Sequence, residues 1–262
     1  MSMSRDARVL LVVPTLGRRP EFLRQTLRSI DDQSVPTRVV MVAPQTADIE
    51  SLAREFDIEV LADPGSLPSA INLGMRHAAH DHDFVNWLND DDLLEPGSLA
   101  TTTALLDEHP RAVVAFGACR YIDPAGQELW ISRAGRWAPR VLSWGPDLIP
   151  QPGMMIRAAA WREVDGLDES YRLAFDLDLL LRLRPLGPFV HTPRIVSSFR
   201  WHATSLTVDD RDTNLRESER AKRAALGPLG RALSTVWNPP VRVAIRLAAA
   251  RVQRRALRVR AQ

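Results

Sequence analysis

The first 120 residues alternate short apolar runs with segments of helical periodicity, and no other feature of the 262-residue chain constrains its fold as strongly. The helical segments lie between the apolar runs and have apolar residues on one face. Strands that alternate with helices in this way predict an α/β fold with a mostly parallel central sheet and helices on both faces. The strands are expected at 9–13, 38–42, 58–62, 84–88 and 112–119, and the helices at 20–30, 47–56, 66–79 and 96–108.

Ligands of such sheets bind beyond the carboxyl ends of the strands. We therefore expect the segments that directly follow four of the strands to line one edge of the sheet. These segments are 14–19, 43–45, 63–68 and 89–92.

The second half of the chain is less regular. The turn sequence Asp-Pro-Ala-Gly at 123–126 predicts a hairpin between two short strands. Residues 1–207 are expected to form one domain, and residues 208–262 a helical C-terminal extension. Within the domain, the remaining elements are expected to be strands at 154–156 and 195–201 and a helix at 174–184.

The charge of the chain is divided between a body and a tail. Residues 240–262 contain seven arginines and no acidic residue, which leaves 27 basic and 32 acidic residues in the preceding 239, a net charge of about −5. An acidic body without an interleaved stripe of basic and aromatic residues argues against nucleic-acid binding. The tail predicts a basic amphipathic helix that suits peripheral contact with an anionic membrane. Packing in a homodimer and a solvated helix are the alternatives.

The cellular compartment follows from two absences in the sequence. A single cysteine, Cys119, excludes an internal disulfide framework and suits a reducing cytoplasm. The apolar run at 9–13 is too short for a signal peptide or a membrane span. We expect a cytoplasmic protein that can lie on the inner face of the plasma membrane.

The strongest local signal for chemistry is the loop Asn89-Asp90-Asp91-Asp92. Unit charges about 4 Å apart repel by roughly 4 kcal/mol at an effective dielectric constant near 20, so three adjacent carboxylates favour a cation between them. Oxygen ligands select Mg²⁺ or Mn²⁺, which can bridge a diphosphate and neutralise its charge as it leaves. The alternative is that Asp92 and Glu95 cap the next helix.

Four segments in order resemble the successive signatures of family 2 glycosyltransferases with the GT-A fold. They are VVPTLGRRPEFLRQTLRSI, LPSAINLGMRHA, WLNDDDLLEPGSL and GLDESYRLAFDLDLLLRL, and the resemblance runs from about residue 9 to 207. It implies transfer of a sugar, with inversion, from a nucleotide-diphosphate donor to the hydroxyl of a sugar or lipid-linked acceptor. It also implies a divalent metal, Mn²⁺ or Mg²⁺, and a role in polysaccharide or glycolipid assembly in a bacterial cell envelope.

The resemblance also implies roles for particular residues. Asp176 matches the catalytic base, Asp91 the direct metal ligand, and His202 a further contact with the metal or the diphosphate, although a half-buried structural histidine is the alternative for His202. The residues that match donor-contacting positions are Pro14, Thr15, Arg18, Asn89, Asp90 and Asp91.

The helical periodicity around Asp176 supports its assignment independently. On a helix, Asp176 shares a face with Leu180 and Leu183, which predicts a partly buried carboxyl of raised pKa that suits a general base. Asp178 is expected on the opposite side, in water and paired with Arg182 four residues on. The alternative is that Asp176 is a helix N-cap.

Five further residues are weaker candidates. Arg200 can pair with phosphate oxygens, and Gln45 stands where many relatives have an acidic pair that holds the nucleobase. Asn72 can bond the adjoining loop or the donor base. Asp168 can contact the acceptor by a hydrogen bond, and Trp137, together with Trp144 in the segment 131–150, can contact it by ring stacking. Each of these residues also has an ordinary structural alternative. Arg200, like Arg18, can be solvated surface, and Asn72 can fill a helix interior. Asp168 can end a turn, and Trp137 can belong to the core.

Two other functions are compatible with these features. A sugar-1-phosphate nucleotidyltransferase also has an α/β sheet and an acidic metal site, but it ordinarily has a glycine-rich basic loop after its first strand, where this chain reads Pro14-Thr15-Leu16-Gly17. A catalytically silent homologue that binds nucleotide sugars as a membrane-associated assembly subunit is the other alternative, since Asn89 and Gln45 replace acidic residues of the pattern.

Overall fold

The computed structural model describes residues 7–133, 135–201 and 210–227. The predictions for His202 and for the basic tail at 240–262 therefore lie outside the described residues.

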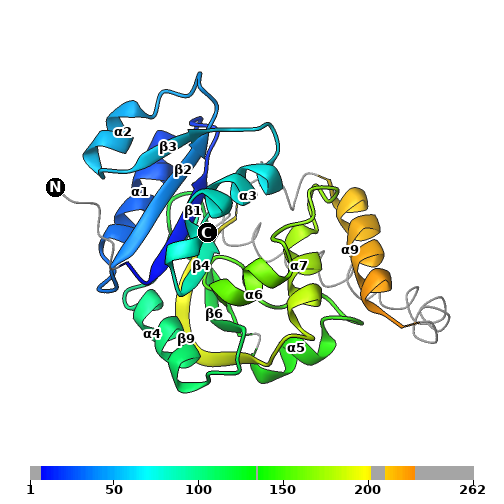
Figure 1. The fold of residues 1–262 in the computed structure, drawn as a ribbon. Coiled ribbons are helices and arrows are strands. Elements are labelled where there is room, and N and C mark those ends of the chain that lie inside the picture. Colours follow the sequence, from blue (N-terminus) through cyan, green and yellow to red (C-terminus); the bar gives the residue numbers. More distant parts are fainter. Residues whose placement is uncertain (1–6, 134, 202–209, 228–262) are drawn as a thin grey trace.

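The N-terminal half has the predicted alternation of strands and helices (Figure 1). Its four strands are parallel and stand in the order β3-β2-β1-β4. The strands are β1 (Val9–Pro14), β2 (Thr37–Ala43), β3 (Glu59–Ala62) and β4 (Phe84–Trp87). The helices that connect them are α1 (Pro20–Asp31), α2 (Glu50–Glu55) and α3 (Leu67–Ala78), and a short 3-10 turn, η1 (Ala79–Asp81), precedes β4.

The second half extends the same sheet with mixed strand directions. β8 is antiparallel to both β4 and β6, β9 is parallel to β6, and the predicted hairpin joins β6 to β7. The predicted strand at 195–201 is the end of a longer β9, whereas β5 has only two residues and has no counterpart among the predicted strands. These strands are β5 (Leu93–Leu94), β6 (Val114–Ile122), β7 (Glu128–Ser132), β8 (Met155–Arg157) and β9 (Phe189–Arg200).

The helices of the second half differ in how well the sequence predicts them. Three of them, α4, α7 and α9, form where helical spacing predicts them, whereas α5, α6 and η2 are too short to show a period. Their bounds are α4 (Ser98–Glu108), η2 (Gly135–Trp137), α5 (Ala138–Val141), α6 (Ala158–Glu163), α7 (Phe175–Leu183) and α9 (Arg211–Ala225).

The core has two layers, one on each face of the sheet. Leu10 and Val12 of β1 pack in the layer with α3, α6 and α7, and Val9, Leu11 and Val13 pack in the layer with α1, α2 and α4. All five side chains are fully buried. A strand covered on both faces has no polar side, and this is why β1 reads as a continuous apolar run. The predicted α/β architecture, with helices on both faces, is confirmed.

Gly117 of β6 allows β9 to approach closely in the long pairing between these two strands. The register shifts between Phe116 and Ala118, and a Cβ at Gly117 would lie 2.8 Å from the carbonyl oxygen of Arg194 and 2.7 Å from a methyl carbon of Val196. Such irregularities bend a strand. The bend lies before the part of β9 that reaches the acidic loop, where Ser198 pairs with Leu93.

We expect Gly117→Ala to lower the free energy of unfolding by about 1–3 kcal/mol, because backbone and a packed β-branched side chain must both move to admit the methyl group. Urea unfolding followed by circular dichroism measures the change. Gly227→Ala is the matched control, since nothing lies within 4 Å of a Cβ at that glycine. Equal stabilities of the two variants would contradict this account of the β6–β9 pairing.

Candidate functional site

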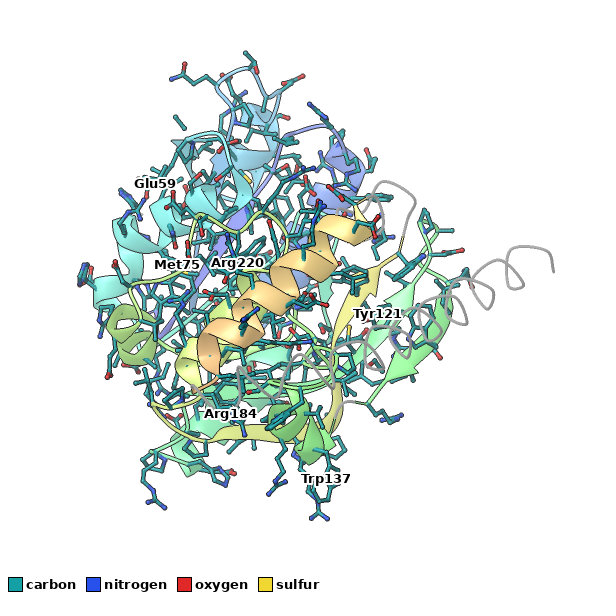
Figure 2. The ribbon with its side chains drawn as sticks, turned by 90° about the vertical axis from the view of Figure 1, so that its right-hand side faces the viewer. Glu59, Met75, Tyr121, Trp137, Arg184 and Arg220 are labelled. Carbon is teal, nitrogen blue, oxygen red and sulfur yellow. The ribbon has the colours of Figure 1, made fainter. Side chains whose placement is uncertain are left out.

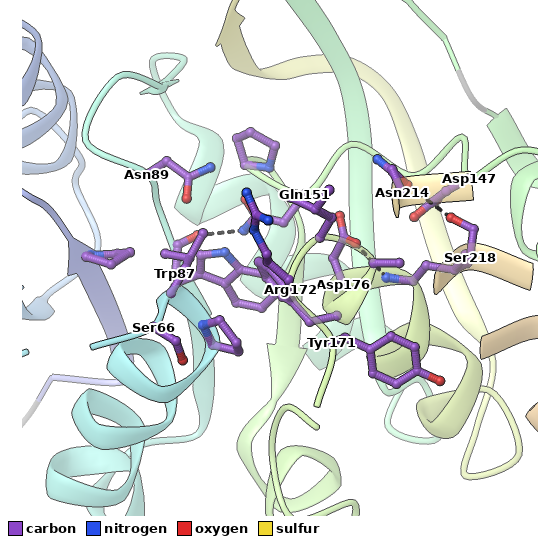
Figure 3. Close-up of a pocket in the computed structure, with 18 of the residues that line it drawn as sticks. Ser66, Trp87, Asn89, Asp147, Gln151, Tyr171, Arg172, Asp176, Asn214 and Ser218 are labelled. Carbon is purple, nitrogen blue, oxygen red and sulfur yellow. Dashed lines mark hydrogen bonds between the residues drawn. The ribbon is translucent and has the colours of Figure 1, made fainter. Parts of the chain in front are cut away.

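Loops from the carboxyl ends of β1, β3 and β4 meet at one cleft of about 1550 Å³, so three of the four segments expected at this edge line it and the segment 43–45 does not. The opposite side of this cleft is formed by the start of α7 and by α9, so that Ser66, Trp87 and Asn89 stand on one side and Asn214 and Ser218 on the other in Figure 3. The structure brings seven of the predicted residues to this cleft: Pro14, Thr15, Arg18, Asn89, Asp90, Asp91 and Asp176.

Asp90 and Asp91 are held by residues at the end of β1 and the start of α1. Thr15 donates its hydroxyl to Asp90 over 2.6 Å. The Arg19 guanidinium pairs with Asp91 at 2.8 Å and with Asp90 at 3.2 Å. Arg19 also lines the cleft, although the sequence analysis singled out its neighbour Arg18.

Asp92, the third acid, is fully buried and faces away from the cleft. Its carboxyl accepts hydrogen bonds from the backbone N–H of Arg200 at 3.0 Å and from the Asn89 amide at 3.2 Å. Burial, followed by the charge of Asp91, raises the pKa of Asp92 well above its usual value despite these bonds. Asp92 therefore attaches the acidic loop to β9.

The capping alternative for these acids is wrong. The N-cap of α4 is Gly97, which provides no side-chain cap. Glu95 instead accepts hydrogen bonds from the Arg120 guanidinium at 3.1 Å and from the Ser198 hydroxyl at 2.6 Å.

Arg200 does not reach the cleft, so its predicted contact with phosphate is not supported. Only 2% of it is exposed, because its guanidinium lies behind the acidic loop. There it donates to the carbonyl of Asp91 at 3.0 Å and to Gln25 at 2.7 Å, and it stacks 4.3 Å from the Phe22 ring. Its role in this structure is to hold the loop from the rear.

Asp176 occupies the first turn of α7 and faces the cleft. The Phe175 ring packs 6.1 Å from Trp87 at the end of β4, and this contact brings Asp176 to the edge where the acidic loop begins. Asp176 accepts a 2.7 Å bond from the N–H of Leu177, while burial raises the pKa of Asp176 to about 6. The raised pKa agrees with the sequence prediction. The N-cap alternative is wrong, since Ala174 is the N-cap.

The predicted exposure of Asp178 is wrong. Its ion pair with Arg182 forms at 2.8 Å as expected, but Asp178 is only 6% exposed. The prediction assumed that this side of α7 faces water, whereas Arg182, the partner of Asp178, also donates to the carbonyl of Val164 at 2.6 Å, so that this side lies against the segment that follows α6.

A second acid lies close to Asp176. Asp147 lines the same cleft, and burial together with the charge of Asp176 raises its pKa. Lys222 of α9 donates to the carbonyl of Gly145 over 2.5 Å, and its positive charge opposes the rise in the pKa of Asp147. Neither Asp147 nor Lys222 stands in a motif, so the sequence analysis missed both.

Glu217 of α9 binds the turn that precedes Asp176. Its carboxylate accepts bonds of 2.8 to 3.1 Å from the backbone N–H groups of Arg172, Leu173 and Ala174. Burial opposes ionisation of Glu217, but these N–H groups together with Arg220 hold its pKa below the usual value. Ala174 is the N-cap of α7 and the other two residues directly precede it, so Glu217 caps the turn that leads into α7 from another helix.

Besides Arg200, four predicted residues lie outside the cleft lining: Gln45, Asn72, Asp168 and Trp137. The Asn72 amide is used by protein groups, since it donates to the carbonyl of Leu167 and to Glu169 and accepts from the N–H of Leu167, each at 2.9 Å. Asp168 accepts from the N–H of Ser170 at 2.9 Å, which is the turn role that was its alternative.

Trp137 and Gln45 are the other two residues outside the cleft lining. Trp137 is 60% exposed, so the core alternative is also wrong for it, and it is Trp144 that lines the cleft. Gln45 is not part of the cleft lining. The segment after β3, which was also expected at this edge, places an acidic residue there, Asp63.

The acidic loop fits a cation that arrives with a diphosphate. Among the described residues, no group of three or more His, Cys, Asp or Glu is placed to hold a metal ion. Mg²⁺ and similar ions are commonly held by one or two carboxylates together with phosphate oxygens. Asp91, at the cleft with its side chain 13% exposed, meets that requirement.

Comparison with known proteins gives concordant matches. A family model described as glycosyl transferase family 2 matches residues 10–158. The O-antigen biosynthesis protein RfbC of Myxococcus xanthus is 30% identical over 197 residues, which cover 69% of this chain and 15% of RfbC. The chain thus spans about 15% of the length of that relative.

Two solved structures share the fold at low identity. TarS residues 1–349 of S. aureus, in complex with UDP-GlcNAc, superimposes with a TM-score of 0.63 and 17% identity over 87% of this chain and 73% of that one. The mannosyltransferase PcManGT of Pyrobaculum calidifontis, in complex with GDP-Man and Mn²⁺, has a TM-score of 0.59 and 16% identity over 93% and 79%. These likenesses confirm the predicted GT-A fold. Across the described residues, no helix has the length and apolar character to cross a membrane.

We expect Glu217→Ala to lower the free energy of unfolding by about 2 kcal/mol, because three backbone N–H groups lose a charged acceptor. For a chain of this size the melting temperature falls by several degrees. Glu108→Ala, which removes an exposed carboxylate at the end of α4, is the control and leaves it unchanged. Equal melting temperatures for both variants would contradict the capping role of Glu217.

Proposed function

Since the chain belongs to glycosyl transferase family 2, we propose that it is an inverting glycosyltransferase that moves a sugar from a nucleotide-diphosphate donor to an acceptor hydroxyl. The acceptor is a sugar or a lipid-linked sugar in the assembly of a cell-surface polysaccharide or glycolipid. The observation that carries the proposal is that Asp91, in the loop after β4, and Asp176, in the first turn of α7, face the same cleft.

The donor occupies the side of the cleft formed by the β1, β3 and β4 loops. Its diphosphate lies against the acidic loop, where Arg18 and Arg19 supply positive charge. A carboxylate can accept hydrogen bonds from a nucleobase or ribose, and Asp63 is the acid available for this beyond β3. TarS with UDP-GlcNAc and PcManGT with GDP-Man are precedents for two different nucleosides in this fold.

Asp91 is the residue of the described chain that would hold a divalent cation, Mg²⁺ or Mn²⁺, and His202 is its predicted companion. The cation would supply neutralisation of the charge that grows on the departing diphosphate. Asp90 contributes by fixing the loop, since its carboxylate is bonded to Thr15 and Arg19. Mn²⁺ in the PcManGT structure supports the choice of metal.

Asp176 acts as the general base. Its carboxylate removes the proton of the acceptor hydroxyl while the oxygen attacks the anomeric carbon on the side opposite the diphosphate. One displacement of this kind inverts the anomeric configuration, and no covalent sugar–enzyme intermediate forms. The raised pKa of Asp176 strengthens it as a base near neutral pH.

The acceptor enters from the other side of the cleft, formed by α9, the turn before α7 and Trp144. Of the two tryptophans predicted to stack on the acceptor, Trp144 takes this role, because it is both 47% exposed and part of the cleft lining. The alternative of a silent nucleotide-sugar-binding subunit shares the donor side but needs no working Asp176. Measurements of binding and turnover separate the two.

We expect one nucleoside diphosphate to raise the melting temperature by about 5–10 °C at a hundredfold excess over its Kd. At a fixed nucleotide concentration the rise is larger with Mn²⁺ than without, because the cation tightens binding. A thermal-shift series with UDP, GDP and the other nucleoside diphosphates identifies the nucleoside. Asp91→Asn loses the Mn²⁺-dependent part, because the cation loses its carboxylate. Asp81→Asn, an exposed acid before β4, keeps it. Mn²⁺ without effect on nucleotide binding would contradict the metal assignment.

We expect Asp176→Asn to lower kcat by about 10²- to 10⁴-fold and to leave nucleotide binding intact. Transfer by the unmodified chain falls as the pH drops through about 6, because a carboxyl of pKa about 6 must be ionised to accept the proton. Glu163→Gln, an exposed acid of α6, preserves both kcat and the pH profile. Unchanged turnover in Asp176→Asn refutes the assignment of the base, whereas binding without turnover in the unmodified chain supports the silent alternative.

A further inference from the structure

Residues 129–146 contain three arginines and three tryptophans but no acidic residue. They run from the end of β7 through η2 and α5 to the rim of the cleft. We define the α5 face as the exposed side chains of this stretch and two neighbours: Arg133, Arg136, Trp137, Arg140, Trp144, Leu148 and Arg184.

The α5 face gathers most of the exposed apolar bulk of the described chain. Five large apolar side chains are exposed in the described chain, and three of them belong to the α5 face. Trp137 is 60% exposed, Trp144 47% and Leu148 41%. Neither tryptophan has the burial that its size would give it in a core.

The arginines of the α5 face lack acidic partners in the described part of the chain. Arg136 and Arg140 lie 5.4 and 4.9 Å from the Trp137 ring. Arg133 donates to the carbonyl of Pro193, and Arg184 to the Ser143 hydroxyl, each at 3.2 Å. None of the four takes part in the described ion pairs, unlike Arg8, Arg19, Arg24 and Arg120 elsewhere.

Figure 2 shows Trp137 and Arg184 toward the same lower end of the molecule. Arginine and tryptophan together suit the interface between lipid headgroups and acyl chains, because the guanidinium binds phosphate while the indole buries its apolar body and keeps its N–H at the polar boundary. A wholly polar anion would leave the two exposed tryptophans and Leu148 in water. The combination therefore favours a lipid surface over a soluble polyanion.

We propose that the α5 face docks the protein on anionic lipid headgroups, with Trp137, Trp144 and Leu148 entering the interfacial layer. Its purpose rests on the proposed function: because Trp144 also lines the cleft, a chain docked in this way opens its acceptor side at the lipid surface. None of the residues of the α5 face belongs to the basic tail at 240–262.

The test is sedimentation of the full chain with vesicles of phosphatidylcholine alone and of phosphatidylcholine with phosphatidylglycerol, at low and at high salt. We expect binding only to the anionic vesicles and weakening by salt. Replacing Arg133, Arg136 and Arg140 together by Gln should weaken the binding by about tenfold or more, since each basic residue near such a surface contributes roughly fivefold. Trp137→Ala should weaken it as well, because an interfacial anchor is lost.

The control variant removes three positive charges from parts of the surface outside the α5 face. Arg28, Arg54 and Arg111 are exposed arginines of other elements and make none of the described ion pairs, and their joint replacement by Gln should have less than half of that effect. A third variant, with Arg254, Arg255 and Arg258 changed to Gln, measures the contribution of the tail.

The proposal is overturned if the α5 and control variants lose equal amounts of vesicle binding. It is also overturned if only the tail variant loses binding. Displacement of the protein from vesicles by polyphosphate, with Trp137→Ala binding as well as the unmodified chain, assigns the face to a soluble polyanion and also overturns it. Thermal shift by the nucleoside diphosphate is measured on the same variants. Its retention separates a failure of docking from a failure of the proposed function.

Discussion

The buried bond between Asp92 and the backbone of Arg200 is the constraint on which the geometry of the cleft depends. Three consecutive carboxyl groups repel one another, and the structure separates them by giving each a different environment. Asp92 turns into the protein against β9, whereas Asp90 and Asp91 stay at the cleft and share Arg19. The Arg200 guanidinium closes the rear of the loop through the carbonyl of Asp91. A loop held from both sides can present Asp91 in a fixed position.

The second half of the site depends on packing between elements far apart in the chain. Trp87 ends β4, immediately before the acidic loop, and its ring contacts both Phe175 and Trp161. The same tryptophan therefore positions the acidic loop by its backbone and α7 by its side chain. Glu217 then fixes the turn before α7 from α9. The extension predicted at 208–262 thus contributes to the cleft through α9, although it follows the segment that the family model matches.

The parallel half of the fold could be predicted because β1 and β4 are buried on both faces and the helices between the strands pack an apolar face on the sheet, so that periodicity records the packing directly. β5 could not be predicted, since two residues have no period and its pairing with Ser197 and Ser198 is set from another strand. The same limit applies to side chains. Asn72 looks like a donor contact in its motif, yet it binds Leu167, 95 residues away. Asp178 is predicted to face water because helical spacing alone does not show that its partner Arg182 packs against Val164, in a segment before α7.

Within the site, prediction succeeded where a residue follows a strand directly and failed where its orientation depends on a distant partner. Asp90 and Asp91 must emerge at the sheet edge once β4 ends at Trp87. Arg200 also ends a strand, but its side chain is drawn behind the loop by Gln25, Asp91 and the Phe22 ring. Whether a charged residue at a strand end faces the ligand or the rear of the loop is decided by these partners, which a single sequence does not reveal.

The distribution of charge would orient the protein as it approaches an anionic surface. The first 239 residues carry a net charge of about −5, so an anionic surface repels the body as a whole, while the α5 face concentrates arginines that no described acid neutralises. Repulsion and attraction from different sides exert a torque that turns the α5 face toward the lipid. Screening limits this effect to about 10 Å at 0.1 M salt, so final orientation depends on insertion of Trp137 and Trp144. Because Trp144 also belongs to the cleft, the contact that ends the approach is the one that places the acceptor side at the surface.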